Sequence, residues 1–407
     1  MKNKCLCCGG FSVGDLVDFG PQPPSNRFKK SSTAETDTHP LSVGQCYACG
    51  MIQLVNPMPA DMVRSEFDWI TYNEPEGHLD DVVRRLSELP NLNKDSRIIG
   101  LTYKDDTTLK RLNDLGFCNV YRYDAVNDLG LLSPYSGLES IQAAFNSQNN
   151  LRLKEKHGLA DLLSVRHILE HSHNPQLFIS EIRKLVKPNG YIWFEMPDSS
   201  KFIKASDYVF IWEEHITYFT SYMMDVFAKN SDIYLNDIII YPYQFEDSLV
   251  AIAENSQWVE KKWPLLLDAD LDQALADGDK FAKQFSDCAR SVRGVLEQWK
   301  IQGKKVAVFG AGHLAAKFLN MYSVGEFVTW VIDDHPSKQG LLMPGSGVPI
   351  IDSSVLTETD VCLLSLNYES ERKVRAKNED YINHGGEFMS IFVDNEGSII
   401  SEARNEF

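Results

Sequence analysis

The sequence has no apolar run long enough to span a bilayer and no block of lysine or arginine residues. Its 407 residues carry 40 basic and 57 acidic side chains, which gives a formal net charge of −17 at pH 7. A membrane span needs ~20 consecutive apolar residues, and nucleic acids or anionic membrane surfaces need a basic patch. The opening residues, MKNKCLCC, also lack the apolar stretch of a signal peptide. We therefore expect a cytoplasmic protein that binds neither membranes nor nucleic acid.

Cysteine is scarce beyond residue 50. The first fifty residues hold five of the eight cysteines, and the other three are scattered: Cys118, Cys288 and Cys362. Such clustering favours a local metal site over a disulfide framework. We predict a structural zinc site with two C-x-x-C pairs as its ligands, each followed by glycine: Cys5, Cys8, Cys46 and Cys49. Cys7 is the alternative to Cys8, but it would break the two-residue spacing.

The length allows two to three domains. We divide the chain into a zinc-binding segment (1–75), a sheet domain (76–256), connecting helices (257–300) and a second sheet domain (301–407). Glycine, proline and serine are sparse from Asp268 to Lys300, and apolar residues recur there at helical spacing. This predicts a packed helix and not a linker.

Proline and glycine are instead abundant in DFGPQPPSNRF, from Asp18 to Phe28. A segment so rich in these residues is typical of irregular structure. We therefore predict a loop there.

Residues 161–219 hold most of the side chains suited to chemistry. Leu162 to Ser164 and Tyr191 to Glu195 are short apolar runs that predict buried strands, with near-helical spacing from Leu177 to Val186 between them. Pro188 to Gly190 predicts the turn that ends this helix. Strand, helix, turn and strand form a right-handed crossover of a parallel sheet, in which ligands bind at the carboxyl ends of the strands. The polar residues fall at those ends: His167, Glu170, His171, Asp198, Glu213, Glu214 and His215.

The carboxyl-terminal part opens with an apolar run that leads into a glycine-rich turn. Gly310 and Gly312 follow KKVAVF, and Asp333 comes after the next apolar run, Val328 to Ile332. In this strand–turn–helix context the pattern predicts a Rossmann-like domain, and the helix N-terminus is suited to a phosphate.

Four motifs carry a family resemblance: RHILEH (166–171), the P-N-G turn, FEMPD (194–198) and W-E-E-H-x-x-Y-F-T (212–220). Together they resemble the second half of a class I methyltransferase domain that binds S-adenosylmethionine. The closer match is to the nucleotide-sugar C-methyltransferases, in which a zinc-binding segment precedes that domain and a second Rossmann-like domain follows it. The resemblance covers nearly the whole chain. It implies a three-part α/β protein with the active cleft between the parts.

The resemblance implies that a base removes a proton beside the carbonyl of a nucleotide-linked keto-sugar. The resulting carbanion then takes the methyl group of S-adenosylmethionine, as in natural-product biosynthesis. His215 matches the family's base, a role that suits imidazole because it titrates near neutrality. Glu214 lies beside it, and His171 matches a second site histidine. Tyr72 stands where the family places a site tyrosine, although the aromatic residues around it are equally suited to packing a domain junction.

Further residues match substrate-binding positions of the family: Asn26, Trp212, Tyr218, Gly310, Gly312 and His313. Trp212 replaces a tyrosine, and an indole has no phenolic proton for a developing oxyanion. Glu246, Asp247 and Ser248 replace a G-G-S sequence, so carboxylates stand where a phosphate would meet glycine amides. Either the substrate differs from a nucleotide sugar or this loop faces solvent.

The cofactor loop lacks its glycines. In the family it reads E-x-G-x-x-x-G, and here Gly100 replaces the acid, Thr102 the first glycine and Asp106 the second. Side chains at these positions occupy space where the backbone approaches the cofactor. Asp105 fits the family's pattern, and with Thr102 it is a candidate cofactor-binding residue.

Two more residues are candidates for binding S-adenosylmethionine. Asp124 ends the segment YRYD, where a carboxylate would bind ribose hydroxyls. His167 lies at the end of the strand that begins at Leu162. Sequence alone does not distinguish an altered loop that still binds the cofactor from one that has lost it.

Two other functions therefore stay open. One is an isomerase, or a reductase that uses a dinucleotide at Gly310 to Ala315. The other is a non-enzymatic binding or assembly protein that keeps the fold. In each case we expect a small-molecule ligand, nucleotide-linked in the favoured case, and a monomer or homodimer.

Overall fold

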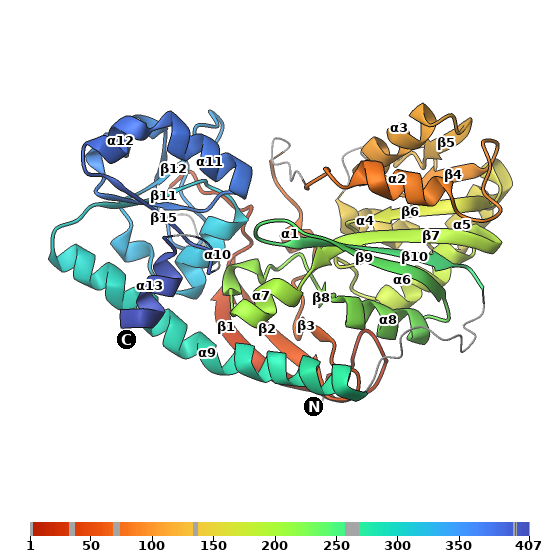
Figure 1. Cartoon of the computed structure of the whole chain (residues 1–407), viewed down its shortest axis with the longest axis horizontal. Coiled ribbons are helices and arrows are strands. Elements are labelled where there is room, and N and C mark those ends of the chain that lie inside the picture. Colours follow the sequence, from red (N-terminus) through yellow and green to blue (C-terminus); the bar gives the residue numbers. More distant parts are fainter. Residues whose placement is uncertain are drawn as a thin grey trace.

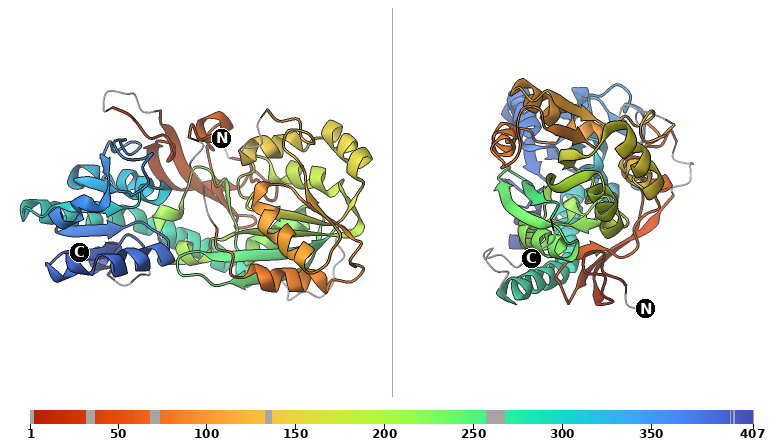
Figure 2. Two further views of the ribbon diagram at one scale, coloured as in Figure 1. Left: turned by 90° about the horizontal axis from the view of Figure 1, so that it is seen from above. Right: turned by 90° about the vertical axis from the view of Figure 1, so that its right-hand side faces the viewer.

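The computed structural model describes residues 3–31, 37–67, 74–132, 137–256, 268–393, 395 and 397–406. Figure 1 shows two sheet domains at the two ends of the molecule, with strands β1 to β3 between them at the base. Viewed from above, the amino-terminal segment again lies between these domains (Figure 2). None of the described helices is both long and apolar enough to cross a bilayer.

The first sheet domain is built on six strands in the order β5-β4-β6-β7-β10-β9. Their bounds are β4 Arg97–Gly100, β5 Asn119–Arg122, β6 Ala160–Arg166, β7 Val186–Asp198, β9 Tyr234–Tyr241 and β10 Asp247–Glu254. Strands β5, β4, β6 and β7 run parallel, whereas β10 is antiparallel to β7 and to β9.

Helices cover both faces of this sheet: α2 Leu79–Ser87, α3 Asp106–Asp114, α4 Leu138–Ala144, α5 Ser147–His157, α6 Pro175–Arg183 and α8 Ser221–Asn230. Neighbouring strand residues point to opposite faces. Ile98 joins the core under α2 and α3, while Ile99 joins the core with α4 to α6 and α8. A parallel sheet buried on both faces is the predicted class I methyltransferase-like fold.

One predicted helix–turn boundary is wrong. Helix α6 ends at Arg183, and Pro188 to Gly190 lie inside strand β7. The register between β6 and β7 shifts between Ala160 and Leu162, so extra residues of β7 bulge out opposite them. Asn189 has a positive φ of 58° there. A bulge thus takes the place of the expected turn.

The second sheet domain has five parallel strands in the order β13-β12-β11-β14-β15. They are β11 Val306–Phe309, β12 Trp330–Ile332, β13 Ile350–Ile351, β14 Val361–Leu364 and β15 Glu387–Ser390. The helices of this part are α10 His313–Met321, α11 Tyr368–Lys377, α12 Glu379–Asn383 and α13 Ile399–Glu406. This parallel sheet confirms the predicted Rossmann-like domain.

A third sheet lies at the base, in the order β1-β2-β3-β8. It contains β1 Val13–Gln22, β2 His39–Cys46, β3 Ile52–Leu54 and β8 Thr217–Tyr218, and α1 Ala60–Val63 follows β3. The predicted loop is wrong for Asp18 to Gln22, which belong to β1. Because β1 is an edge strand and its register shifts between Asp18 and Pro21, the missing N–H of Pro21 leaves no central ladder bond unmade.

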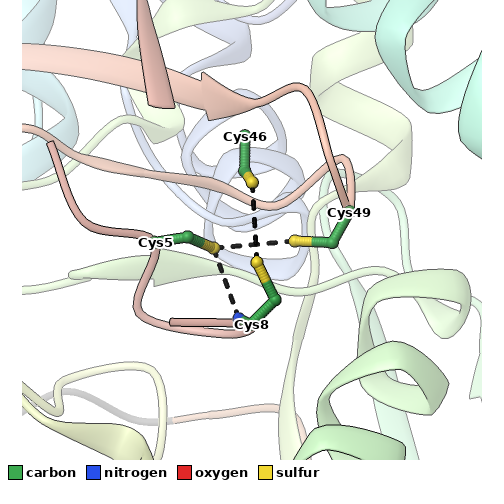
Figure 3. Close-up of side chains that lie close together, drawn as sticks. All are labelled: Cys5, Cys8, Cys46 and Cys49. Carbon is green, nitrogen blue, oxygen red and sulfur yellow. Dashed lines mark hydrogen bonds between the residues drawn. The ribbon is translucent and has the colours of Figure 1, made fainter. Parts of the chain in front are cut away.

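Four cysteine side chains meet beside this sheet (Figure 3). The sulfurs of Cys5 and Cys49 are 3.6 Å apart and those of Cys8 and Cys46 are 3.7 Å apart. Zinc–sulfur bonds of ~2.3 Å in a tetrahedron place sulfurs ~3.8 Å apart. The cluster therefore fits a zinc ion with four thiolate ligands, and the structure brings in Cys8 as predicted.

Helix α9, Asp268–Ile301, runs along the base from beneath β1 to β3 to the second sheet domain (Figure 1). It confirms the predicted packed helix. The Gln45 side chain donates to the carbonyl of Ala274 at 2.8 Å. Phe281 is 0% exposed, and its carbonyl accepts from the Tyr208 hydroxyl at 2.6 Å. The helix thus joins the basal sheet to residues just before Trp212.

Replacing Cys46 by Ser should release the zinc ion, because three thiolates and a hydroxyl bind zinc more weakly than four thiolates. The zinc content of purified protein, measured by plasma mass spectrometry, should fall from one ion per chain to well below one. Cys7→Ser is the matched control and should keep the ion. Loss of zinc from the Cys7 variant, with retention in Cys46→Ser, would contradict the ligand set.

Replacing Phe281 by Ala should lower the free energy of unfolding by about 3–5 kcal/mol, the range for large-to-small changes in a packed core. Urea denaturation followed by tryptophan fluorescence measures this loss. Ile301→Ala at the end of the same helix is the control, because Ile301 is 73% exposed. Equal effects of the two substitutions would show that α9 is not packed as described.

Candidate active site

The polar residues predicted at the strand ends do come together at the carboxyl ends of β6 and β7. His167 follows β6 directly, and its backbone N–H donates to the carbonyl of Glu195 in β7 at 2.8 Å. The loop from Trp212 to His215 lies against the next turn, because the N–H of Ile216 donates to the carbonyl of Glu170 at 2.7 Å. Two segments of the central stretch thereby form one site.

His171 and His215 are the centre of this site. Their rings are nearly perpendicular, with centroids 4.9 Å apart, and a carboxylate oxygen of Glu170 lies within 4.8 Å of a ring nitrogen of each. Burial lowers the pKa of His215, and the carboxylates of Glu170 and Glu74 offset only part of this effect. Burial lowers the pKa of His171 further. Both imidazoles are therefore neutral at pH 7 and can accept a proton.

His167 is in the opposite state. Burial alone would lower its pKa, but the carboxylates of Glu74 and Glu195 raise it to about 10. Its ring nitrogens lie 3.3 Å from Glu195 and 3.6 Å from Glu170. His167 is therefore a charged imidazolium surrounded by carboxylates, and it does not serve as a base. Its predicted contact with a cofactor stays a prediction.

Glu195 is a site residue that the sequence analysis missed. Its carboxylate is buried, and it accepts from Arg166 Nε at 2.5 Å and lies 2.9 Å from His78 Nε2. The cations His167 and Arg166 hold its pKa well below the usual value despite burial. The sequence did offer a signal for Glu195. It is a charged residue at the end of the apolar run YIWFE, and an acid in a buried strand needs partners.

Trp212 is held on two sides. Its ring stacks on that of His313, with centroids 4.4 Å apart and planes 20° apart. The Tyr218 hydroxyl accepts from the backbone N–H of Trp212 at 3.1 Å and donates to the Trp212 carbonyl at 3.2 Å. Asn26 Nδ2 lies 3.4 Å from a carboxylate oxygen of Glu214. The candidate substrate residues Asn26, Trp212, Tyr218 and His313 thus surround the loop that carries His215.

Two other candidates give different outcomes. Tyr72 falls in 68–73, outside the described residues. Gly310 has a φ of 102°, and a Cβ there would come within 2.6 Å of Leu366, so packing requires this glycine. Gly312 has an ordinary extended conformation.

The glycine-rich turn at Gly310 to Gly312 is also held by hydrogen bonds to side chains of its own domain. The N–H of Ala311 donates to Asp333 at 2.9 Å, and Lys338 Nζ donates to the Ala311 carbonyl and to Asp333, both at 2.8 Å. A dinucleotide would need this carboxylate for its ribose. The contacts therefore argue against the reductase alternative.

Asp105 holds the cofactor loop from within. Asp105 is fully buried, and its carboxylate accepts from the N–H groups of Leu101 and Thr102, both at 2.8 Å. It also accepts from the Ser164 hydroxyl at 2.6 Å. A Cβ on Gly100 would come within 2.7 Å of the Asp105 Cβ. A glycine at position 100 thus leaves room for the Asp105 side chain.

The two lost glycines leave no backbone strain. Thr102 has a φ of −135° and Asp106 one of −54°, both ordinary for residues with side chains. The Thr102 hydroxyl accepts from the N–H of Lys104 at 3.1 Å, and Asp106 pairs with Arg122 at 3.1 Å. The protein itself thus engages both side chains. The loop keeps a strand–turn–helix form, from β4 through Thr102 to α3.

Asp124 lies just after β5, next to this loop. One of its carboxylate oxygens accepts from the N–H groups of Val126 at 3.0 Å and Asn127 at 2.6 Å. These bonds orient the carboxylate at the carboxyl end of the sheet, where a ribose would be bound.

Glu246 carries less charge than the sequence indicates. Burial and the nearby Glu74 raise its pKa to about 8, so the carboxyl group is largely protonated at pH 7. The replacement of G-G-S by Glu246, Asp247 and Ser248 therefore repels an anionic ligand less than the residue types suggest.

Three family models match consecutive parts of the chain: "Putative zinc binding domain" at residues 5–63, "Methyltransferase domain" at 66–231 and "C-methyltransferase C-terminal domain" at 268–392. The chain is similar along nearly its whole length to the C-methyltransferase NovU of Streptomyces niveus. The two are 22% identical over 406 residues, which cover 95% of this chain and 94% of NovU.

Solved structures match over a smaller part. An O-methyltransferase family protein of Burkholderia thailandensis is 13% identical, covers 44% of this chain and 56% of its own, and has a TM-score of 0.29. The 1,6-didemethyltoxoflavin-N1-methyltransferase of the same organism is 10% identical and covers 44% and 78%, also with a TM-score of 0.29. Scores this low add nothing to the assignment. The methyltransferase domain match and the full-length similarity to NovU support an enzyme whose three matched parts, in this order, resemble those of a C-methyltransferase.

Proposed function

We propose that the protein methylates the carbon beside the carbonyl of a nucleotide-linked keto-sugar, with His215 as the general base. The observation that carries this proposal is the neutral, half-buried imidazole of His215, whose ring centroid lies 4.9 Å from that of His171, with carboxylates around it at the carboxyl ends of the parallel strands. The similarity to C-methyltransferases supports carbon as the methylated atom, because acidic C–H groups need a positioned base.

The surroundings of His215 suit both of its protonation states. Burial keeps the imidazole neutral before the reaction, so its lone pair is available to remove the proton from carbon. Glu170 and Glu74 then stabilise the imidazolium that forms, since both carboxylates favour its charged form. Glu74 itself stays ionised, because His167 and Lys104 lower its pKa to about 2 despite its burial.

The loop after β4 would hold the cofactor. Bound S-adenosylmethionine supplies the methyl group. Asp105 keeps the loop in shape from within, Thr102 lies at its turn, and Asp124 is placed for the ribose hydroxyls. Arg166 links this loop to the base site, because its guanidinium donates both to the Lys104 carbonyl and to Glu195.

Trp212 cannot supply the phenolic proton of the tyrosine it replaces. We infer that its indole ring, stacked on His313, instead packs against the sugar. The substrate should therefore bind beside the stacked rings of Trp212 and His313.

Replacing His215 by Ala should reduce methyl transfer by about 10²–10⁴-fold, the usual contribution of a general base. Transfer of labelled methyl from S-adenosylmethionine to thymidine- and uridine-diphosphate 4-keto-6-deoxyhexoses measures this loss. Calorimetry should show that the variant still binds S-adenosylmethionine. His173→Ala is the control, because His173 is an exposed histidine two residues from His171. A fully active His215→Ala enzyme would rule out the proposed base.

The pH dependence of kcat follows from the lowered pKa of His215. The base works only when neutral, so kcat should stay constant as pH falls towards 6.5 and decline only below that ordinary histidine value. Rate measurements between pH 4.5 and 8 on zinc-loaded protein test this. An acidic limb centred above pH 7 would mean that another group, or a raised His215 pKa, controls the rate.

A further inference from the structure

A buried ion pair joins the second sheet domain to the loop that carries His215. Lys317 of α10 and Glu213 of the loop both have side chains that are only 1% exposed, and Lys317 Nζ lies 2.5 Å from Glu213 Oε2. The same carboxylate accepts from the Ser25 N–H at 2.5 Å and from the Ser25 hydroxyl at 3.3 Å. Three distant parts of the chain thus meet on Glu213.

Burying such a pair is costly in free energy. Both ions lose their hydration, and the attraction regained in the interior often does no better than apolar side chains of the same size. A contribution to the stability of the fold is therefore a weak explanation for the presence of this buried ion pair. Its position suggests another reason, because Glu213 precedes Glu214 and His215 directly.

Helix α10 of the second domain reaches this loop through two contacts. Lys317 holds Glu213, and His313 stacks on Trp212. The turn before α10 is closed by Asp333 and Lys338, so the face of the domain that would bind a dinucleotide is already occupied by its own side chains. Helix α10 therefore contributes to the site by supporting residues 212–215.

We propose that Lys317 is a positioning residue, which fixes the loop through Glu213 and so places His215 for proton abstraction. This inference rests on the proposed role of His215 as the base. In this proposal, a lysine on the first helix of the second Rossmann-like domain holds the base in position.

The pair also contributes to the charge around His215. The charged groups with the largest effects on its imidazole are Glu170, Glu74, His167 and Glu213, and Glu213 favours the protonated form. The rings of His171 and His313 also interact with it electrostatically. Glu213→Gln removes that anion and leaves Lys317 as a cation, so the pKa of His215 should fall. Adding Lys317→Met removes the cation and should return the pKa towards that of the wild type.

The test compares Glu213→Gln, Lys317→Met and the double variant on zinc-loaded full-length protein. Nuclear magnetic resonance of labelled histidines gives the His215 pKa without turnover, and methyl transfer to the keto-deoxyhexose nucleotides gives kcat and KM. If Lys317 positions the loop, plateau kcat falls about 10- to 100-fold in all three variants, as expected when a reacting group is displaced by ~1 Å. KM should rise as well, because the same loop carries Trp212, which we infer packs against the sugar.

The double variant separates positioning from charge balance. It buries no unpaired charge, so it should fold, and its His215 pKa should recover while its kcat stays low. Recovery of kcat together with the pKa would overturn the proposal, because the pair would then only balance charge. A kcat of Lys317→Met equal to that of the wild type would also overturn the proposal. If a single variant fails to fold, as judged by circular dichroism, the kcat and the His215 pKa of the double variant distinguish positioning from charge balance.

Lys338→Met is the matched control, since Lys338 is a paired lysine of the same domain whose partner is Asp333 and not a residue of the loop. Its kcat and His215 pKa should equal those of the wild type. Failure of the base assignment itself would be recognised separately, by full activity of His215→Ala. In that case the pKa shifts still report whether Glu213 and Lys317 act on His215.

Discussion

The buried carboxylate of Glu195 is the constraint on which the site depends. An anion in the middle of a sheet must be neutralised. Arg166 and His167 do so here, and His78 Nε2 lies 2.9 Å from the same carboxylate. Arg166 and His167 lie at the end of the neighbouring strand, and His167 has a positive φ of 47° where the chain leaves it. The demand for countercharge thereby fixes the direction of the turn that presents Glu170 and His171.

The same buried network assigns different tasks to chemically identical side chains. His167 contacts two carboxylates directly and stays protonated, whereas His171 and His215 lie next to each other and stay neutral. The charged ring holds the acids in place, and the neutral rings are free to take up a proton. Environment, and not residue type, therefore decides which histidine is suited to be a base.

Local patterns predicted much of the fold and part of the site. The C-x-x-C pairs, the strand–helix–strand unit and the glycine-rich turn depend on neighbours in sequence, and their positions followed from spacing. Pro21 in a strand, the countercharges of Glu195 and the contact of Lys317 with Glu213 depend on pairing between distant segments. The cofactor loop shows a further limit, because the sequence reveals the loss of the acid at Gly100 but not the hydrogen bonds by which Asp105 holds the turn from within.

Strand β8 gives the zinc cluster a wider importance. It is a short piece of the central stretch that pairs with β3, with Tyr218 opposite Ile52 and Thr217 opposite Gln53. Cys49 lies three residues before Ile52, and His215 lies three before Tyr218. The metal cluster and the base are therefore connected by one rung of a β-ladder. Loss of the metal should therefore loosen the strand pair that leads to His215, so the activity of the enzyme should depend on the zinc supply of its cell.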